Sequence, residues 1–296
     1  MRVPPQVRWL PDGKRLHLND GPIDLIVEAF GDKNQIHTAY RAAVDRFVTV
    51  LDELCAELTL LRKPALLDSA PPSGRVALRM VNAVAPFAKR CFVTPMAAVA
   101  GAVAEEILEA MTSVAHLDRA YVNDGGDIAF HLGDGQQLVA GMIERPDCPS
   151  LLGTVTLRFD QPSRGLATSG WRGRSFSLGI ADAVTVLAKS ASLADAAATV
   201  VANAVNLPEH PGIVRQPACE LAPDNDLGNI PVTRFVGELT EGEIGKALDS
   251  GALVAEELLA EDLISSAALS LQGHLRIVGS QKDHLVQSES RSLVHA

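Results

Sequence analysis

Six strand-length segments follow one another in the middle of the chain, and this run constrains the fold more than any other feature of the sequence. The segments cover 119–124, 127–132, 137–143, 152–159, 165–169 and 182–188. Gly125-Gly126 and Gly133-Asp134-Gly135 separate the first three as hairpin turns, where glycine is a common residue. Since hairpins join antiparallel strands, the run predicts a mainly antiparallel sheet.

Helical patterns flank the strands on both sides. They predict helices over 34–62, 75–88, 95–114 and 192–205, and two short helices over 240–250 and 251–260. Lys63-Pro64 ends the first helix and Thr94-Pro95 opens the third. The sum is an α+β protein with helices packed on a mainly antiparallel sheet, forming one domain over residues 1–280. A loose polar tail is expected over 281–296.

The remaining segments are shorter. Residues 7–30 predict two strands joined by a turn at Pro11-Asp12-Gly13. Residues 207–231 are rich in Pro, Asn and Asp and predict a loop with little regular structure. A strand is expected over 233–238, and a last hairpin over 267–279.

Charge and hydropathy narrow the kind of partner. The net charge of −10 and the pI near 5.3 argue against nucleic acid or an anionic membrane as the main partner. No apolar run reaches the roughly 18 residues that a membrane-crossing helix needs. The segment Met1 to Pro5 lacks the apolar stretch of an export signal, so the cytoplasm is the expected location.

Small side chains dominate the predicted interior. Aromatic residues make up only 4% of the chain and alanine is frequent, which predicts closely apposed helices and strands. The alanine-rich helices could equally form a homodimer interface. The chain has no C-x-x-C pair, so its cysteines are expected to be reduced thiols, with Cys55 and Cys91 in the core. The four are Cys55, Cys91, Cys148 and Cys219.

The segment from Ser192 to Thr199 is the first candidate for chemistry. Asp195 and Thr199 lie four residues apart in a run of alanines, so both side chains leave one face of a helix. Two hard oxygen donors at this spacing suit Mg²⁺ or Ca²⁺ better than zinc. The alternative is structural: a helix dipole favours a first-turn Asp, and a mid-helix Thr often bonds to its own backbone.

Two further segments carry glycines and hydroxyls. They are Val122-Asn-Asp-Gly-Gly-Asp-Ile-Ala-Phe130 and Gly165-Leu-Ala-Thr-Ser-Gly170. Taken in order with the helix Pro95–Met111, the strand Val184-Thr185-Val186 and the Asp195–Thr199 helix, they resemble the ApbE family of FAD:protein FMN transferases. The likeness covers roughly residues 90 to 205 and is strongest to a smaller branch known as UPF0280.

The resemblance implies a flavin site with a metal. It assigns Asp195, Thr199 and the backbone carbonyl of Val99 to Mg²⁺. It assigns to the FAD cofactor the positions Gly101, Asn123, Gly125, Gly126, Asp127, Thr168, Ser169 and Gly170. By themselves, Gly125-Gly126 could equally be an ordinary hairpin turn. Close packing at the start of the 95–114 helix could be against protein backbone or against a ligand.

Three arginines surround the Thr168-Ser169-Gly170 strand. Arg164, Arg172 and Arg174 lie within eleven residues and could neutralise a phosphate or a carboxylated substrate. The alternative is a solvated hairpin loop, since most loop charges face water.

The chain departs from the family pattern at three positions. Ala100 and Ala102 stand where the family has a lysine and a tyrosine, although Gly101 and an acidic residue, Glu105, are kept. Leu178 stands where the family has a histidine, and leucine cannot transfer a proton. The eight histidines show no metal-binding or catalytic spacing, so the sequence names no catalytic residue.

Three hypotheses follow. The first is Mg²⁺-assisted cleavage of FAD or transfer of its FMN part, with Asp195 and Thr199 holding the metal. The second is a non-flavinylating or differently catalytic member that takes another flavin, a pterin or a small anionic ligand. The third is a scaffold in which the Asp195–Thr199 pair merely packs. The expected partner is a small nucleotide-like or anionic molecule.

Overall fold

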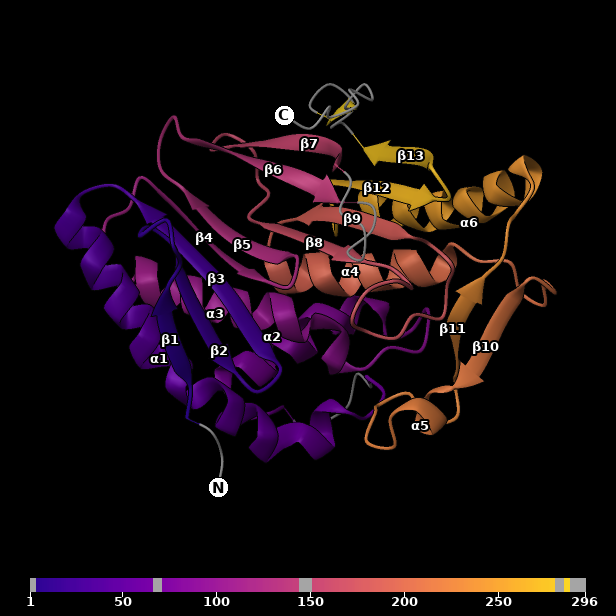
Figure 1. The fold of residues 1–296 in the computed structure, drawn as a ribbon, viewed down its shortest axis with the longest axis horizontal. Helices are drawn as coiled ribbons and strands as arrows, with labels where there is room; N and C mark the ends of the chain where they lie inside the picture. The colour runs from indigo at the N-terminus through magenta and orange to yellow at the C-terminus, as the bar shows by residue number, and fades with distance from the viewer. Residues whose placement is uncertain (1–3, 66–70, 144–150, 280–284, 288–296) are drawn as a thin grey trace.

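A nine-stranded antiparallel sheet is the largest element of the fold. The structure is a computed structural model that describes residues 4–65, 71–143, 151–279 and 285–287. The strand order is β1-β2-β3-β4-β5-β8-β9-β12-β13 (Figure 1). The strands are β1 (Gln6–Trp9), β2 (Leu16–Asp20), β3 (Ile23–Phe30), β4 (Arg119–Asp124), β5 (Asp127–Leu132), β8 (Gly165–Ser169), β9 (Ala183–Ala188), β12 (Ser266–Leu271) and β13 (His274–Gly279). The predicted α+β class with a mainly antiparallel sheet is confirmed.

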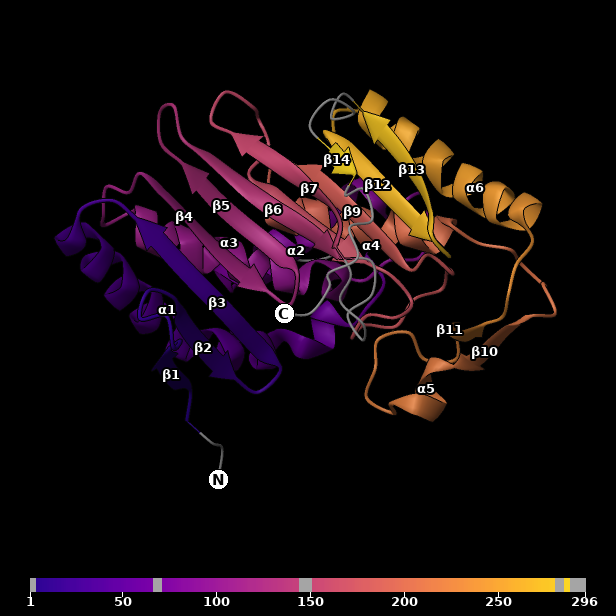
Figure 2. The same ribbon diagram turned by 45° about the horizontal axis from the view of Figure 1, so that its top comes forward.

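A smaller sheet covers part of one face. It contains β6 (Gln137–Ile143), β7 (Leu151–Arg158) and β14 (Leu285–Gln287) in the order β14-β7-β6. Figure 2 shows β6 and β7 lying across the strands of the large sheet. Leu157 of β7 packs with Phe130 of β5, Leu166 of β8 and Leu187 of β9 in a separate apolar cluster.

The helices cover the opposite face. They are α1 (Lys33–Leu61), α2 (Arg75–Val84), α3 (Val99–Thr112), α4 (Ala191–Ala204) and α6 (Glu241–Ala260), with short 3-10 turns η1 (Ala85–Phe87) and η2 (Pro95–Ala98). In Figure 1 α3 and α4 lie beneath the middle of the sheet and α6 beneath its C-terminal edge. Eight alanines and valines of α4 are buried, so small side chains let this helix approach both the sheet and α3 closely.

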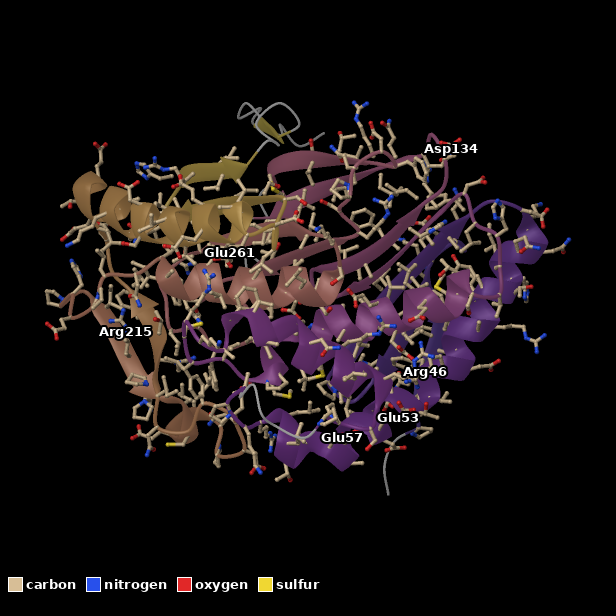
Figure 3. All side chains as sticks on the ribbon, turned by 180° about the vertical axis from the view of Figure 1, so that it is seen from behind. Arg46, Glu53, Glu57, Asp134, Arg215 and Glu261 are labelled. Atoms are coloured by element: carbon tan, nitrogen blue, oxygen red, sulfur yellow. The ribbon has the colours of Figure 1, made fainter. Side chains whose placement is uncertain are left out.

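An ion-pair cluster fixes the helices relative to one another. Glu106 of α3 is only 2% exposed and accepts hydrogen bonds from Arg46 of α1 (2.8 Å) and Arg79 of α2 (3.2 Å). Burial raises the pKa of Glu106, but the surrounding arginines outweigh burial and hold that pKa below its usual value. Arg46 also contacts Glu53, which lies two turns further along the same face of α1 (Figure 3). Removing Glu106 would take away a partner that both arginines share, while Arg46 would keep its pair with Glu53.

The N-terminal and C-terminal predictions need correction. Residues 7–30 form three strands and not two, because a second turn at Gly21, whose φ is +57°, separates β2 from β3. Residues 240–260 form one helix and not two. Gly251 does not break α6, because its missing Cβ makes room for Val205, which a Cβ would approach to 2.3 Å.

Two other predictions are wrong. The segment 207–231 contains β10 (Ile213–Pro217) and the short α5 (Ala218–Leu221), and β10 pairs with β11 (Pro231–Val236). The pairing joins residues far apart in sequence, which the loop-like composition conceals. Cys55 and Cys91 are exposed and not in the core, since Cys55 lies on the outer face of α1. Cys148 and most of the predicted 281–296 tail lie outside the described residues, although 285–287 form β14.

Within the described residues, no helix is both long and apolar enough to cross a membrane.

Candidate functional site

A cavity of about 290 Å³ opens where α4, the start of α3 and two loops meet. This volume is near the lower end for small-molecule sites. Its walls come from one face of α4, from residues 92–100, from Asp127 of β5, from the loop 174–178 and from Asp226-Leu227. The cavity therefore gathers segments that are more than one hundred residues apart in the sequence.

Helix α4 is held in place by two glycines. A Cβ on Gly101 of α3 would lie 2.3 Å from the carbonyl oxygen of Ala191. A Cβ on Gly165 of β8 would lie 2.2 Å from the backbone nitrogen of the same residue. The first turn of α4 thus packs closely between α3 and β8. The close packing expected at the start of the 95–114 helix is against protein backbone.

Asp195 and Thr199 lie on the cavity-facing side of α4, as the four-residue spacing predicts. Oδ2 of Asp195 accepts a hydrogen bond from the backbone N–H of Gly101 at 3.0 Å, in the first turn of α3. The Thr199 hydroxyl is 3.5 Å from the Ser169 hydroxyl and donates toward it. Val99 lines the same cavity. The proposed metal-binding positions are therefore together and open to a ligand.

Asp127 joins the strand Thr168-Ser169-Gly170 to this group. Its Oδ1 accepts from the backbone N–H of Thr168 at 3.1 Å. The Thr168 hydroxyl, by contrast, bonds to Thr185 at 2.9 Å and is used within the sheet. Gly170 provides space for backbone, because a Cβ there would lie 2.3 Å from the carbonyl oxygen of Asp182. Of these positions, only Asp127 lines the cavity.

The Gly125-Gly126 turn places an arginine. Both glycines have positive φ, +65° and +118°, and the Gly126 N–H donates to Oδ1 of Asn123 at 2.8 Å. A Cβ on Gly125 would lie 2.0 Å from Nη2 of Arg174. Gly125 therefore forms the surface on which the Arg174 guanidinium rests.

The three arginines have different positions. Arg174 lines the cavity and lies 3.7 Å from Asp124. Arg172 pairs with the buried Asp182 at 2.8 Å. Arg164 donates to backbone carbonyls of its own loop, including that of Gln161 at 2.6 Å. Among the described residues that line the cavity, Arg174 is the only cation.

Three carboxylates in and beside the cavity resist ionisation. Burial raises the pKa of Asp124 to about 7, against the partial opposition of Arg174. Burial also raises the pKa values of Asp127 and Asp195, and each is raised further by a neighbouring carboxylate. Ionising these carboxyls together is therefore unfavourable in the free cavity, and a bound cation would favour their negatively charged forms.

The raised pKa of Asp124 predicts a pH-dependent stability. Its ordinary value is 3.8, so between about pH 4 and pH 7 the folded protein retains a proton that the unfolded chain has lost. The free energy of unfolding should fall as the pH rises through this window, by at most about 1.4 kcal/mol per pH unit for one proton. Above pH 7 the contribution levels off. Thermal unfolding from pH 4 to pH 8 in EDTA measures the slope.

The matched variants are Asp124→Asn and Asp134→Asn. Asp134 is exposed in the turn after β5 (Figure 3), so its replacement should leave the slope unchanged. Asp124→Asn should make the slope shallower without removing it, because Asp127 and Asp195 still retain protons in this range. Equal slopes in wild type and Asp124→Asn would contradict the assignment.

Sequence patterns did not indicate Asn203 or Asp226. Asn203 lines the cavity one turn beyond Thr199, and the eight-residue spacing from Asp195 is the signal that could have revealed it. Asp226 accepts a hydrogen bond from the Thr94 hydroxyl, and both residues line the cavity. That contact joins a loop after α5 to the start of η2 and has no local sequence signal.

The donors present fit a hard cation. No three His, Cys, Asp or Glu side chains within the described ranges cluster as a metal site. Mg²⁺ does not need such a cluster, because it usually keeps several waters and takes one or two carboxylates together with ligand phosphates. Asp195 with the Thr199 hydroxyl matches that requirement, whereas zinc would need nitrogen or sulfur ligands.

Comparisons with known proteins show which family the chain is similar to. A family model described as AbpE bacteria matches residues 7–277. A UPF0280 protein of Methanopyrus kandleri is 34% identical over 205 residues, covering 69% of this chain and 73% of the relative. A second UPF0280 protein, from Methanothrix thermoacetophila, is 36% identical over 182 residues, 58% of this chain and 70% of the relative.

One solved structure is also similar. It is the apo form of the Pseudomonas stutzeri flavinyl transferase ApbE, at 11% identity and a TM-score of 0.40, covering 93% of this chain and 95% of that one.

Proposed function

Because the chain belongs to the ApbE-like family, in its UPF0280 branch, we propose that its cavity binds a flavin or a related nucleotide together with Mg²⁺. The observation that carries this proposal is the convergence of Asp195, Thr199 and Asp127 with Arg174 in one cavity. Oxygen donors for a hard cation thus lie beside a cation that can contact a phosphate.

The charges of the cavity make the metal and the ligand interdependent. Asp127, Asp195 and Asp226 face a single arginine among the described lining residues. A pyrophosphate entering alone would oppose the ionisation of Asp127 and Asp195, so the metal-holding carboxylates would stay protonated. Bound Mg²⁺ would neutralise phosphate oxygens and polarise the phosphoryl group. Asp195 and Thr199 would hold the ion, and Arg174 would contact the anion.

Binding of FAD is therefore expected to depend strongly on Mg²⁺. Titration calorimetry should show at least tenfold tighter binding of FAD with Mg²⁺ than with EDTA. Arg174→Gln should weaken the Mg²⁺-dependent binding by roughly tenfold to one hundredfold, because one charge-assisted contact contributes roughly 1.5–3 kcal/mol. Arg234→Gln makes the same charge change at an exposed position of β11 and is the control. Equal affinity for FAD in Mg²⁺ and in EDTA would refute the proposal.

The position of Leu178 favours a second candidate function. Its side chain belongs to the cavity wall, where it offers no group for proton transfer. A ligand-binding member that does not transfer FMN, or that acts on another anionic or pterin-like compound, fits this wall. Chromatography of a reaction with FAD and Mg²⁺ distinguishes the two: release of AMP or FMN supports cleavage, and intact FAD supports binding alone.

A further inference from the structure

Asn203 marks a second polar position in the cavity, away from the metal end. It follows Asp195 by eight residues and Thr199 by four, so the three side chains form a row along one face of α4. At 1.5 Å per residue the row extends about 12 Å. The cavity is thus long enough for a ligand with chemically different ends.

The orientation of the Asn203 amide is determined by its partners. Its Oδ1 accepts from the backbone N–H of Leu178 at 2.9 Å and from the Ser177 hydroxyl at 3.3 Å. Only the oxygen of the amide can accept from a backbone N–H, so Nδ2 must lie on the other side of the group.

The two N–H groups on Nδ2 have no acceptor within the described part of the chain. Nδ2 is also absent from the buried side-chain atoms of that part that lack a partner, which are Nε of Arg119 and Oγ1 of Thr233. Since Asn203 lines the cavity, the amide donors are accessible from it.

Apolar side chains share the cavity wall with Asn203. Phe176, Leu178 and Val200 line the cavity together with Asn203. An apolar wall with one placed amide is typical of sites that orient a neutral ring by its polar edge. These three side chains offer a phosphate nothing to replace the hydration it would lose against them.

We propose that Asn203 is a specificity-determining ligand contact, donating from Nδ2 to a carbonyl oxygen or ring nitrogen of a neutral heterocycle. This inference rests on the proposed function, since it assigns the uncharged part of the nucleotide to the Asn203 end and the phosphates to the Asp195 end. The oxygen of the same amide positions Leu178, so one residue orients both the wall and the ligand.

The test is Asn203→Asp. Aspartate has nearly the same shape and keeps an acceptor for Leu178 N–H and Ser177, but it lacks both donors. The melting temperature should therefore stay close to that of the wild type. Affinity for FAD in the presence of Mg²⁺, measured by titration calorimetry, should fall at least tenfold. The increase in affinity caused by Mg²⁺ should persist.

Ser175→Asp controls for the added charge. Ser175 also lines the cavity but is exposed, so this variant adds the same charge without removing an amide. It should weaken FAD binding clearly less than Asn203→Asp. Equal losses in the two variants, or no loss in Asn203→Asp, would overturn the inference alone. A wild-type protein that does not bind FAD with Mg²⁺ would overturn the proposed function and this inference together.

Discussion

Replacing Asp195 with asparagine is expected to remove Mg²⁺-dependent binding of FAD, with a loss of at least one hundredfold in affinity. Asparagine keeps an oxygen that can accept the Gly101 N–H, so the contact between α4 and α3 survives. What disappears is the negative charge that a hard cation needs. Titration calorimetry with and without Mg²⁺ gives the comparison directly.

The same variant should not be less stable than the wild type. Burial and the charge of Asp127 raise the pKa of Asp195, which means that ionising this carboxyl is unfavourable in the metal-free protein. A neutral amide relieves that cost, so the melting temperature in EDTA should be unchanged or higher. Asp134→Asn, at an exposed turn, should bind FAD as the wild type does. Undiminished Mg²⁺-dependent binding by Asp195→Asn would show that the carboxylate only anchors α3.

Replacing Gly101 with alanine is expected to lower the free energy of unfolding by about 3 kcal/mol, the upper range for overpacking. The new Cβ would lie 2.3 Å from the Ala191 carbonyl oxygen and 2.7 Å from the Ser192 nitrogen. Both are backbone atoms, which cannot move aside as a flexible side chain would. Helix α4 must shift, and Asp195 and Thr199 shift with it. Urea denaturation measures the loss, and FAD affinity should fall in parallel.

Gly245→Ala is the matched control. Gly245 lies in helix α6, and a Cβ there meets nothing within 4 Å. Alanine is the better helix former, so this variant should be stabilised by up to about 1 kcal/mol. If Gly101→Ala were equally stabilising, the close approach of α3 to α4 would have to be abandoned.

The sequence predicts those features that depend on local periodicity. The four-residue spacing of Asp195 and Thr199 placed both on the cavity face of α4, and Gly125-Gly126 was correctly identified as a turn between two strands. The antiparallel arrangement also followed from short connections between strands. In each case the information lies within a few residues.

Contacts between distant segments could not be predicted in the same way. Nothing near Gly125 in the sequence indicates that Arg174 rests against it, because that contact depends on the path of a loop fifty residues later. The Thr94–Asp226 hydrogen bond joins residues 132 apart, and the β10–β11 pairing likewise depends on the path of the chain between its strands. The three arginines lie within eleven residues of the sequence but have different contacts, because the path of the folded loop determines that Arg174 lines the cavity.

The close packing of Gly101 and Gly165 against α4 limits which parts of the cavity could change to alter ligand preference. The first turn of α4 packs against backbone on both sides, so the helix is held in a fixed position. The side-chain oxygens of Asp195 and Thr199 are fixed with it. Another part of the cavity wall comes from the loop 174–178 and from Asp226-Leu227. Side chains there can be replaced without changing the packing of α4 against Gly101 and Gly165. A change of ligand preference would therefore begin with substitutions in those loops, and the proposed cation ligands Asp195 and Thr199 would stay in place.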